Sequence, residues 1–284
     1  MLTLIVILVI ILALALGIVR IYGAYRWQQG TQTLRTQLEQ TRVPRAPQPV
    51  DLEALGSLPA PVEQYLHTVL QPGQPLVTAV RVQHQGHFNL GTTADRWQPF
   101  TSEQRVVIQR PGFDWDACIS LLPGVPIYVH DAYVVGEGLL QVALLGCFPL
   151  LTLRGPGDLA QGELMRFLAE AAWYPTALLP GQGVQWKTVD QRCADATLTD
   201  GAVTVILRFR FTDQGLIDTV QAEARGRLVD GETIPTPWQG RFWHYEQRGP
   251  MRVPLAGEVA WLLPEGPKPY WRGCITRLTY ELAD

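Results

Sequence analysis

The sequence predicts an α+β fold that is mostly β, with one N-terminal transmembrane helix followed by a large curved antiparallel sheet packed with a few helices. Leu2 to Val19 is an almost uninterrupted apolar run, close to the length that spans a bilayer. Residues 80–90 and 203–212 alternate apolar and polar side chains, as half-buried strands do. Three Asp- and Gly-containing turn signals between residues 200 and 231 indicate a meander of long antiparallel strands.

The N-terminal apolar run is interrupted only by Thr3 and Gly17, and Ile21 to Tyr25 can extend it. A cleaved signal peptide is the competing interpretation. No Lys or Arg precedes the run and no A-x-A cleavage site follows it, which favours an anchor. We therefore expect residues 1–25 to anchor a single-pass protein in an inner or cytoplasmic membrane.

The charges beside this anchor indicate its orientation. All nearby basic residues follow the run: Arg20, Arg26, Arg35, Arg42 and Arg45. The positive-inside rule then slightly favours a cytoplasmic position for the rest of the chain. The four cysteines are far apart in the sequence, which is compatible with isolated thiols in a reducing compartment.

The remainder divides into a linker and one domain. Residues 26–50 form a polar juxtamembrane segment that ends in the Pro-rich stretch 43–49. Residues 51–284 are expected to form a single soluble β-rich domain of about ten strands. Apolar spacing predicts helices over 59–70 and 158–173, the second capped at its start by Asp158.

The helix over 158–173 carries its charges in one stripe, Glu163, Arg166 and Glu170. The sequence favours a solvated face with two weak ion pairs. The alternative is a helix lying across the sheet, with this stripe buried against partners such as Arg241 or Arg272. The pattern alone leaves both interpretations open.

Several function classes lack their signatures. The net charge is −3 and no basic patch is visible, which argues against nucleic-acid binding. There is no serine nucleophile motif, phosphate-binding loop or dinucleotide fingerprint. His84 and His87 lie three apart on a predicted strand and so face opposite sides, and no H-E-x-x-H is present. We expect no catalytic residue, metal site or cofactor.

Carboxylates are the remaining enzyme-like feature. Asp114 and Asp116 flank Trp115, and a glycosidase-type pair would need two carboxyl groups held about 5–10 Å apart in a cleft. Five others could converge: Asp131, Glu137, Glu163, Glu170 and Glu258. Turn and surface roles are the favoured interpretation.

Aromatic stretches set beside charged residues are the most distinctive feature. They are compatible with ordinary core and hairpin ends. They also suit an apolar cavity with a polar rim. Its predicted aromatic lining is Trp97, Phe100, Trp115, Trp173, Tyr174, Trp238, Phe242, Trp261 and Trp271. Its predicted contacts to a polar head group are Arg166, Arg241 and Arg272.

These stretches also carry a family resemblance. The strings GELMRFLAEAAWYPTALLP (162–180) and GEVAWLLPEGPKPYWRG (257–273), with PFTSEQ (99–104) and PGFDWDA (111–117), resemble an uncharacterised bacterial family classed as a domain of unknown function. The resemblance covers roughly residues 55–282 and implies no activity.

A fainter resemblance concerns the turn RPGFDW (110–115). It is similar to a turn in the outer-membrane lipoprotein carriers and related lipoprotein-sorting folds. That resemblance implies a curved antiparallel sheet wrapped around helices and an apolar cavity for acyl chains. Analogy of fold does not establish function, and a cytoplasmic orientation argues against a periplasmic carrier.

We predict membrane-tethered, non-catalytic binding of an apolar or amphipathic ligand, in particular a lipid, beside the membrane that Leu2 to Val19 enters. Burial of acyl chain would drive such binding, at about 0.8 kcal/mol per CH₂. The alternative is a membrane-anchored interaction or regulatory scaffold. A carboxylate-based hydrolase is third. The sequence identifies no protein partner.

Overall fold

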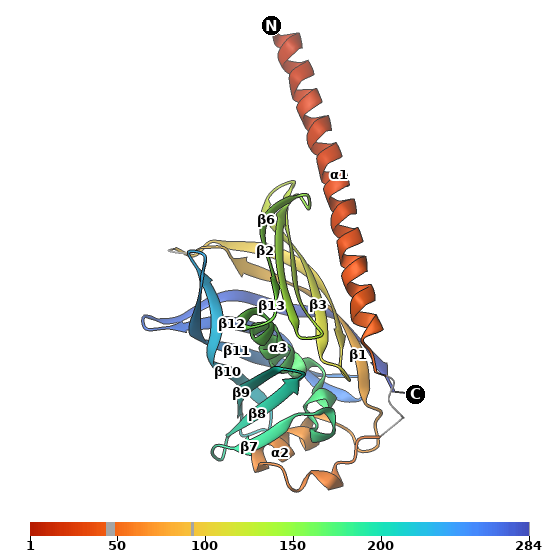
Figure 1. Ribbon diagram of the computed structural model, residues 1–284, viewed down its shortest axis with the longest axis vertical. Helices are drawn as coiled ribbons and strands as arrows, with labels where there is room; N and C mark the ends of the chain where they lie inside the picture. The colour runs from red at the N-terminus through yellow and green to blue at the C-terminus, as the bar shows by residue number, and fades with distance from the viewer. Residues whose placement is uncertain (44–48, 92–93, 284) are drawn as a thin grey trace.

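The structure is a computed structural model of the chain and describes residues 1–43, 49–91 and 94–283. Most of the Pro-rich stretch at 43–49 lies outside the described residues. One 13-stranded sheet dominates the fold, with the order β6-β5-β4-β3-β2-β1-β13-β12-β11-β10-β9-β8-β7. All neighbouring strands pair antiparallel, and the sheet curves around the helices (Figure 1). The predicted fold class is confirmed, with more strands than the ten expected.

The strands fall into two runs along the chain. The first six are β1 Val77–Asn89, β2 Trp97–Val107, β3 Gly112–Leu122, β4 Val125–Val134, β5 Glu137–Leu144 and β6 Phe148–Gly155. The last seven are β7 Gln185–Thr188, β8 Cys193–Asp200, β9 Val203–Phe211, β10 Ile217–Val229, β11 Glu232–Arg248, β12 Met251–Leu263 and β13 Gly266–Leu282. Pairing of β1 with β13 joins the two runs into one sheet.

The helices are α1 Leu2–Gln40, α2 Ala60–Val69 and α3 Asp158–Glu170, with short 3₁₀ turns η1 Glu53–Leu55, η2 Ala171–Trp173, η3 Pro175–Leu178 and η4 Pro180–Gln182. The helices predicted over 59–70 and 158–173 are therefore present. The cap of α3 was assigned wrongly, because Gly157, at φ +78°, precedes the helix and Asp158 opens its first turn.

Helix α3 connects the two ends of the sheet. It follows β6 at one edge, and it packs against β4, β5 and β6 on one side and against β9 and β10 on the other. It therefore lies across the concave face, as Figure 1 shows. Strand β9 presents Val205, Leu207 and Phe209 to this interior and exposes Thr204 and Ile206. The alternation read from the sequence thus marks the core side.

Helix α1 has two halves with different surroundings. Among the described residues it is the one helix long and apolar enough to cross a membrane, a property that a signal sequence would share. Its first half stands clear of the sheet (Figure 1). Its second half packs against β2, β3 and β4 through one stripe of buried residues: Gly23, Trp27, Thr31, Leu34 and Leu38. The helix has no break at residue 25.

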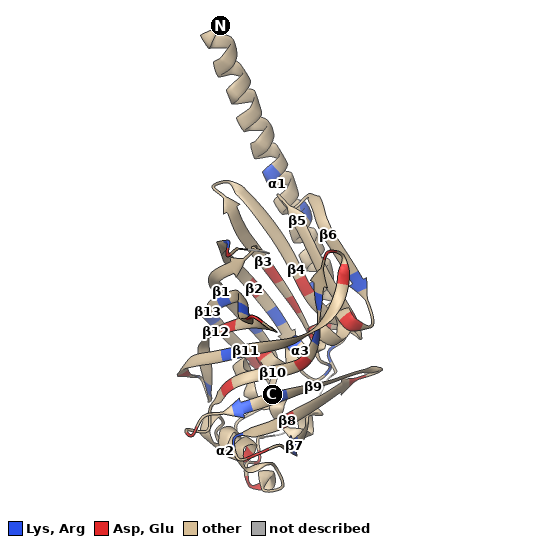
Figure 2. Cartoon of the chain, turned by 90° about the vertical axis from the view of Figure 1, so that its left-hand side faces the viewer, with Lys and Arg blue, Asp and Glu red and all other residues tan. Residues whose placement is uncertain are grey.

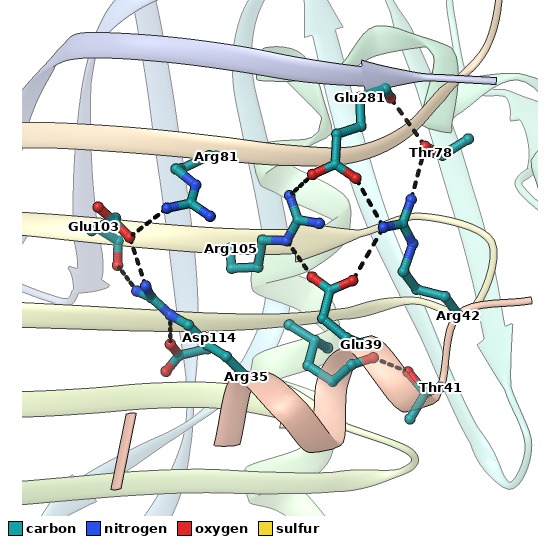
Figure 3. Close-up of polar contacts among 11 residues, drawn as sticks. Arg35, Glu39, Thr41, Arg42, Thr78, Arg81, Glu103, Arg105, Asp114 and Glu281 are labelled. Carbon is teal, nitrogen blue, oxygen red and sulfur yellow. Dashed lines mark hydrogen bonds and ion pairs between the residues drawn. The ribbon is translucent and has the colours of Figure 1, made fainter. Parts of the chain in front are cut away.

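Ion pairs reinforce this packing on the convex side of the sheet (Figure 3). The Arg35 guanidinium contacts Glu103 at 2.6 Å and Asp114 at 2.8 Å. Further along the helix, Glu39 contacts Arg105 of β2 at 2.5 Å. Arg105 also contacts Glu281 of β13 at 2.6 Å. The sheet is therefore held to the helix at several points along two turns.

The same contacts assign a role to the carboxylates that flank Trp115. Asp114 pairs with Arg35, and Asp116 accepts hydrogen bonds from Trp27 Nε1 at 2.8 Å and Thr31 Oγ1 at 3.1 Å. Alternation along β3 points both toward α1, while Trp115 points to the opposite, concave face. This pair holds α1 on the sheet and does not form a cleft.

Asp114 predicts a pH dependence of stability. Burial raises the pKa of Asp114 from its ordinary value of 3.8 to about 7, against the opposing effect of Arg35. The folded state then binds a proton that the unfolded state releases, so stability falls as pH rises from about 4 to about 7, by up to about 1.4 kcal/mol per pH unit. Asp114→Asn should flatten this slope in thermal unfolding of the full chain in detergent. Asp213→Asn, at an exposed site, should not, and parallel curves for wild type and Asp114→Asn would contradict the assignment.

Candidate ligand-binding cavity

A cavity of about 120 Å³ lies between the concave face of the sheet and the segment formed by α3 and η2. Its wall comes from strands on both halves of the sheet as well as from the helix. The apolar part consists of Phe88, Trp115, Val129, Leu140, Ala169, Trp173, Trp238, Phe242, Val259, Tyr270 and Trp271. The cavity therefore exists only because the curved sheet brings its two arms together around α3.

Aromatic rings pack closely on one side of this cavity. Trp173 contacts Phe242 edge to face at 6.0 Å between ring centroids, and it lies 6.5 Å from Trp271 and 5.0 Å from His84. Phe100 supports Trp115 and Trp271 from behind, at 5.9 and 5.7 Å. Such contacts hold large rings rigidly, so the wall is preformed.

A charged cluster forms the opposite part of the wall. Arg166 contacts Asp131 at 2.5 Å and Glu170 at 2.7 Å, and its guanidinium stacks over the rings of Phe113 and Trp115 at 5.0 and 4.8 Å. Each carboxylate therefore directs one oxygen to Arg166, and the second oxygen of Glu170 accepts a hydrogen bond from Gln104 Nε2 at 2.5 Å. This arrangement suits a structural ion pair better than acid–base chemistry.

A second buried pair lies beside the first. Arg225 contacts Glu163 at 3.2 Å and the Tyr270 hydroxyl at 3.3 Å, and it stacks over Trp238 at 5.2 Å. The Tyr270 hydroxyl also accepts the Trp238 indole N–H at 2.9 Å. These contacts tie α3 to β10, β11 and β13 at the edge of the cavity.

Burial and neighbouring charges set the protonation states here. Burial, with the charge of Asp131, raises the pKa of Glu163 well above its usual range despite the nearby arginines. Burial alone would lower the pKa of Arg166, but Glu170, Asp131 and Glu163 outweigh it and raise that pKa. Burial lowers the pKa of His84 to about 3. The histidine is thus neutral at pH 7, and Arg166 is charged.

Two tryptophans that line the cavity have an indole N–H group without a hydrogen-bond partner. Trp115 and Trp173 are each 3% exposed, and their Nε1 atoms have no hydrogen-bond partner among the described residues. A buried donor without an acceptor costs about 1–3 kcal/mol. Other buried polar atoms, such as the Tyr65 hydroxyl and His84 Nε2, also lack a partner among the described residues. The two tryptophans differ from Tyr65 and His84 because they line the cavity.

The cavity unites seven of the twelve residues proposed from the sequence: Trp115, Arg166, Trp173, Trp238, Arg241, Phe242 and Trp271. Five lie outside its lining. Phe100 is behind the wall, Tyr174 is fully buried with its hydroxyl donating to the Phe167 carbonyl, and Trp261 stacks on Tyr270.

The other two, Trp97 and Arg272, lie together outside the lining and next to it. Arg272 stacks over the Trp97 ring at 4.6 Å and pairs with Glu258. Its side chain is 52% exposed, whereas Glu258 is 17% exposed and lines the cavity. The contact of Arg272 with Trp97 is a cation–π interaction near the surface of the sheet.

The solvated-face interpretation of the α3 stripe was wrong. Glu163 is 4% exposed, and the side chains of Arg166 and Glu170 are 14% and 12% exposed. The alternative placed the stripe correctly but named the wrong partners, because Asp131 and Arg225 fill that role. Arg241 is exposed, and Arg272 pairs elsewhere.

Arg225 is the main residue that the sequence did not reveal. It sits in a strand whose alternation would point Ala222 and Ala224 inward. A register shift between Ala222 and Arg225 reverses the alternation and turns the arginine into the interior. Such a β-bulge leaves no clear mark in the sequence.

Metal binding finds no support in this region. Within the described ranges, no group of three or more His, Cys, Asp or Glu side chains is placed to hold an ion. His84 is buried and His87 exposed, on opposite faces of β1. The histidine spacing was therefore interpreted correctly.

Comparisons with solved structures give two likenesses at low identity. A LolA superfamily protein from Nitrosomonas europaea is 9% identical, with a TM-score of 0.40, covering 82% of this chain and 94% of that one. A beta-barrel-like protein of domain of unknown function DUF1849 from Brucella abortus is 11% identical, with a TM-score of 0.21, covering 73% of this chain and 100% of that one. No curated protein sequence matches the chain.

A family model described as "Family of unknown function (DUF6920)" matches residues 56–280. The matched segment contains all four strings that carried the family resemblance. The resemblance to an uncharacterised family noted from the sequence is thus confirmed. Because the match spans most of the chain, the protein belongs to this family of unknown function, DUF6920.

Proposed function

We propose that the protein is a membrane-tethered, non-catalytic receptor for an amphipathic, lipid-like ligand. The observation that carries this proposal is the apolar cavity lined largely by aromatic side chains, two of which, Trp115 and Trp173, have an indole N–H without a hydrogen-bond partner among the described residues. An apolar group would fill the cavity, and an oxygen of the ligand would accept from the indoles. Burial of each methylene contributes about 0.8 kcal/mol.

The charges favour an uncharged polar group on the ligand. Arg166 is neutralised by Asp131 and Glu170, and Arg225 faces Glu163. Burial raises the pKa of Glu163, but even with Glu163 protonated, Asp131 and Glu170 supply two negative charges for the two guanidinium groups. The cluster therefore has no net positive charge for an anionic head group. A carbonyl or hydroxyl oxygen, as in an ester or a monoacylglycerol, matches the indole donors best.

The cavity volume limits how much ligand it encloses. An engineered protein cavity of about 150 Å³ holds one benzene molecule, so about 120 Å³ takes a short length of chain. The rest of a lipid would extend over the half-buried apolar side chains Leu121, Leu144 and Val142, which pack against the core on the same arm of the sheet. This route ends at the side of the domain nearest the apolar half of α1.

The proposed function includes a membrane anchor at the N-terminus. Residues 1–25 would anchor the chain, and residues 51–284 would form the ligand-binding domain on the cytoplasmic side, where Arg20 and Arg26 agree with the positive-inside rule. Because the second half of α1 packs on the sheet, the intervening segment would act as a rigid post and not as a flexible linker.

Filling the cavity tests the proposal. Gly240 lies on its wall, and a Cβ added there meets only Trp238, Phe242 and Val259, at 3.4–3.8 Å. The series Gly240→Ala, Gly240→Val and Gly240→Leu should occupy the space progressively. Glycine is a poor strand residue, so stability should hold while bound ligand falls, about tenfold for the largest side chain if some 1.4 kcal/mol of contact is lost.

The measurement is native mass spectrometry of the full chain in detergent, with extraction of copurified lipid and titration with a monoacylglycerol. Thr204→Leu adds apolar bulk on the exposed side of β9 and controls for detergent and lipid adhering to the surface. Undiminished binding by Gly240→Leu, or wild-type protein that neither carries nor takes up lipid, would refute the cavity as a binding site.

A further inference from the structure

Two neighbouring hairpins lack charge over their entire ends. Residues 117–129, across the β3–β4 turn, and residues 138–153, across the β5–β6 turn, contain no Asp, Glu, Lys or Arg. Large apolar side chains are nevertheless exposed there, with Leu122 at 60%, Phe148 at 51% and Leu150 at 58%. Figure 2 shows these hairpin ends uncoloured, in contrast to the charges lower on the sheet. Clustered exposed apolar residues mark a contact surface.

The hairpin ends lie beside α1 at one defined level. Gly23 packs so closely that an added Cβ would lie 1.8 Å from the Leu145 carbonyl oxygen and 3.2 Å from Cys147 Sγ. At the other turn, a Cβ on Gly124 would lie 3.2 Å from the Arg20 guanidinium. Both turns therefore meet the helix at residues 20–23, directly after its apolar run. Figure 1 shows the far end of α1 extending beyond the sheet.

That level carries the marks of a membrane boundary. Tyr22 and Tyr25 are 54% and 60% exposed, and Arg20 and Arg26 flank them. Tyrosine and tryptophan concentrate where a bilayer meets water, and basic residues lie just outside it. If residues 2–19 occupy the bilayer, the two turns are placed at its surface.

We propose that the β3–β4 and β5–β6 hairpin ends, defined by Leu122, Phe148 and Leu150, insert into the interfacial layer of the same membrane. The inference rests on the membrane anchor in the proposed function. Lipid is the occupant favoured over a protein, because the close approach of Leu145 to Gly23 and of Gly124 to Arg20 holds both hairpins against α1, beside the bilayer that the helix enters. Apolar segments of this kind bury about 5–10 Å deep, at the boundary of head groups and acyl chains.

This contact gives the hairpins a role in ligand entry. Leu121 and Leu144 lie one residue inside the two turns and are half-buried against the core. Val129 on β4 and Leu140 on β5 line the cavity. A lipid leaving the bilayer at the hairpin ends would therefore meet apolar side chains of β3 and β5 on its way to the cavity.

The test uses the full chain in phosphatidylcholine vesicles. Its four native cysteines are replaced, and a single cysteine at position 122, 148 or 150 carries the fluorophore NBD. A lipid with a doxyl quencher high on the acyl chain should reduce NBD fluorescence at least about twofold at all three positions, as interfacial burial requires. Ile206 is as exposed, at 57%, but lies on β9, and its probe should be unaffected.

A probe at Leu14, within the apolar run, separates the two proposals. Quenching at Leu14 without quenching at the hairpins would overturn this inference and leave the anchor intact. Absence of quenching at Leu14 would overturn the anchor itself. Hairpin probes that are shielded from aqueous iodide yet not quenched by lipid would indicate a protein partner and also overturn it.

Replacing the cysteines could disturb the fold, because Cys193 is buried. A second measurement therefore keeps all four. Benzoylphenylalanine in place of Leu122, Phe148 or Leu150 should cross-link to phospholipid on illumination, whereas the same residue in place of Ile206 should not. Equal cross-linking at Ile206 and at the hairpins would overturn the inference.

Discussion

Replacing Arg166 with alanine is expected to lower the free energy of unfolding by about 3–5 kcal/mol, because it strands two buried carboxylates. Asp131 and Glu170 both direct oxygens to this guanidinium, and it covers the rings of Phe113 and Trp115. Removing one partner of a buried charge cluster destabilises the protein by far more than the intact cluster stabilises it relative to apolar residues of similar volume. Thermal and denaturant unfolding of the full chain in detergent, followed by tryptophan fluorescence, measures the loss.

Arg154→Ala provides the matched control. Arg154 also pairs with a carboxylate, Glu137, at 3.0 Å, but the two side chains are 59% and 49% exposed. Exposed pairs contribute about 0–1 kcal/mol, so this variant should unfold close to wild type. Equal effects of the two substitutions would mean that the Arg166 cluster is solvated, contrary to its burial.

Trp173→Ala is expected to cost about 3–5 kcal/mol, the range for removal of a buried tryptophan. Trp173 is 3% exposed and packs against His84, Phe242 and Trp271. The vacated space would join the existing cavity. Because apolar protein cavities bind small aromatic molecules, indole should raise the unfolding temperature of the variant and leave that of the wild type nearly unchanged.

Trp243→Ala controls for the loss of a tryptophan as such. Trp243 is 36% exposed, and its one ring contact is with His244, so its removal should change stability little. If indole stabilised Trp173→Ala no more than Trp243→Ala, the vacated site would have collapsed. The cavity would then be smaller, and its wall less rigid, than the contacts between its aromatic rings indicate.

Local pattern was sufficient for the elements of this fold. The alternation in Val203–Phe211 and the apolar spacing of Ala60–Val69 depend on which side of a strand or helix is buried, and this repeats every two or about 3.6 residues. Turns at Asp200-Gly201 and Asp230-Gly231 depend on backbone preference, which is also local. The apolar run of Leu2 to Val19 needs only length and composition.

The site was partly predictable for a related reason. Large aromatic residues such as Trp115, Trp238 and Phe242 are bound to be buried somewhere, and in a curved sheet their inward side is the cavity side. Tyr174 satisfied the same criterion yet belongs to the solid core. Trp97 and Arg272 contact each other and lie outside the lining, although Arg272 pairs with the lining residue Glu258. Composition indicates which aromatic side chains are buried, but it does not indicate which of them line a cavity.

Contacts between side chains far apart in the sequence do not follow from local pattern. Whether the charges of α3 were buried depended on Asp131, 35 residues away, and on Arg225, which a bulge turns inward. Likewise, Asp114 and Asp116 were directed to α1 only once that helix packed on the convex face. A charge enters the interior only where a partner meets it, and the partner is set by the packing of the whole chain.

Length, hydropathy and periodicity thus specify the apolar N-terminal helix, the strands and the other helices, because each depends on residues within a few positions of one another. The cavity, its charged wall and the level at which the hairpins meet α1 depend on how one curved sheet closes around α3. That closure sums many long-range contacts, and no short stretch of the sequence encodes it.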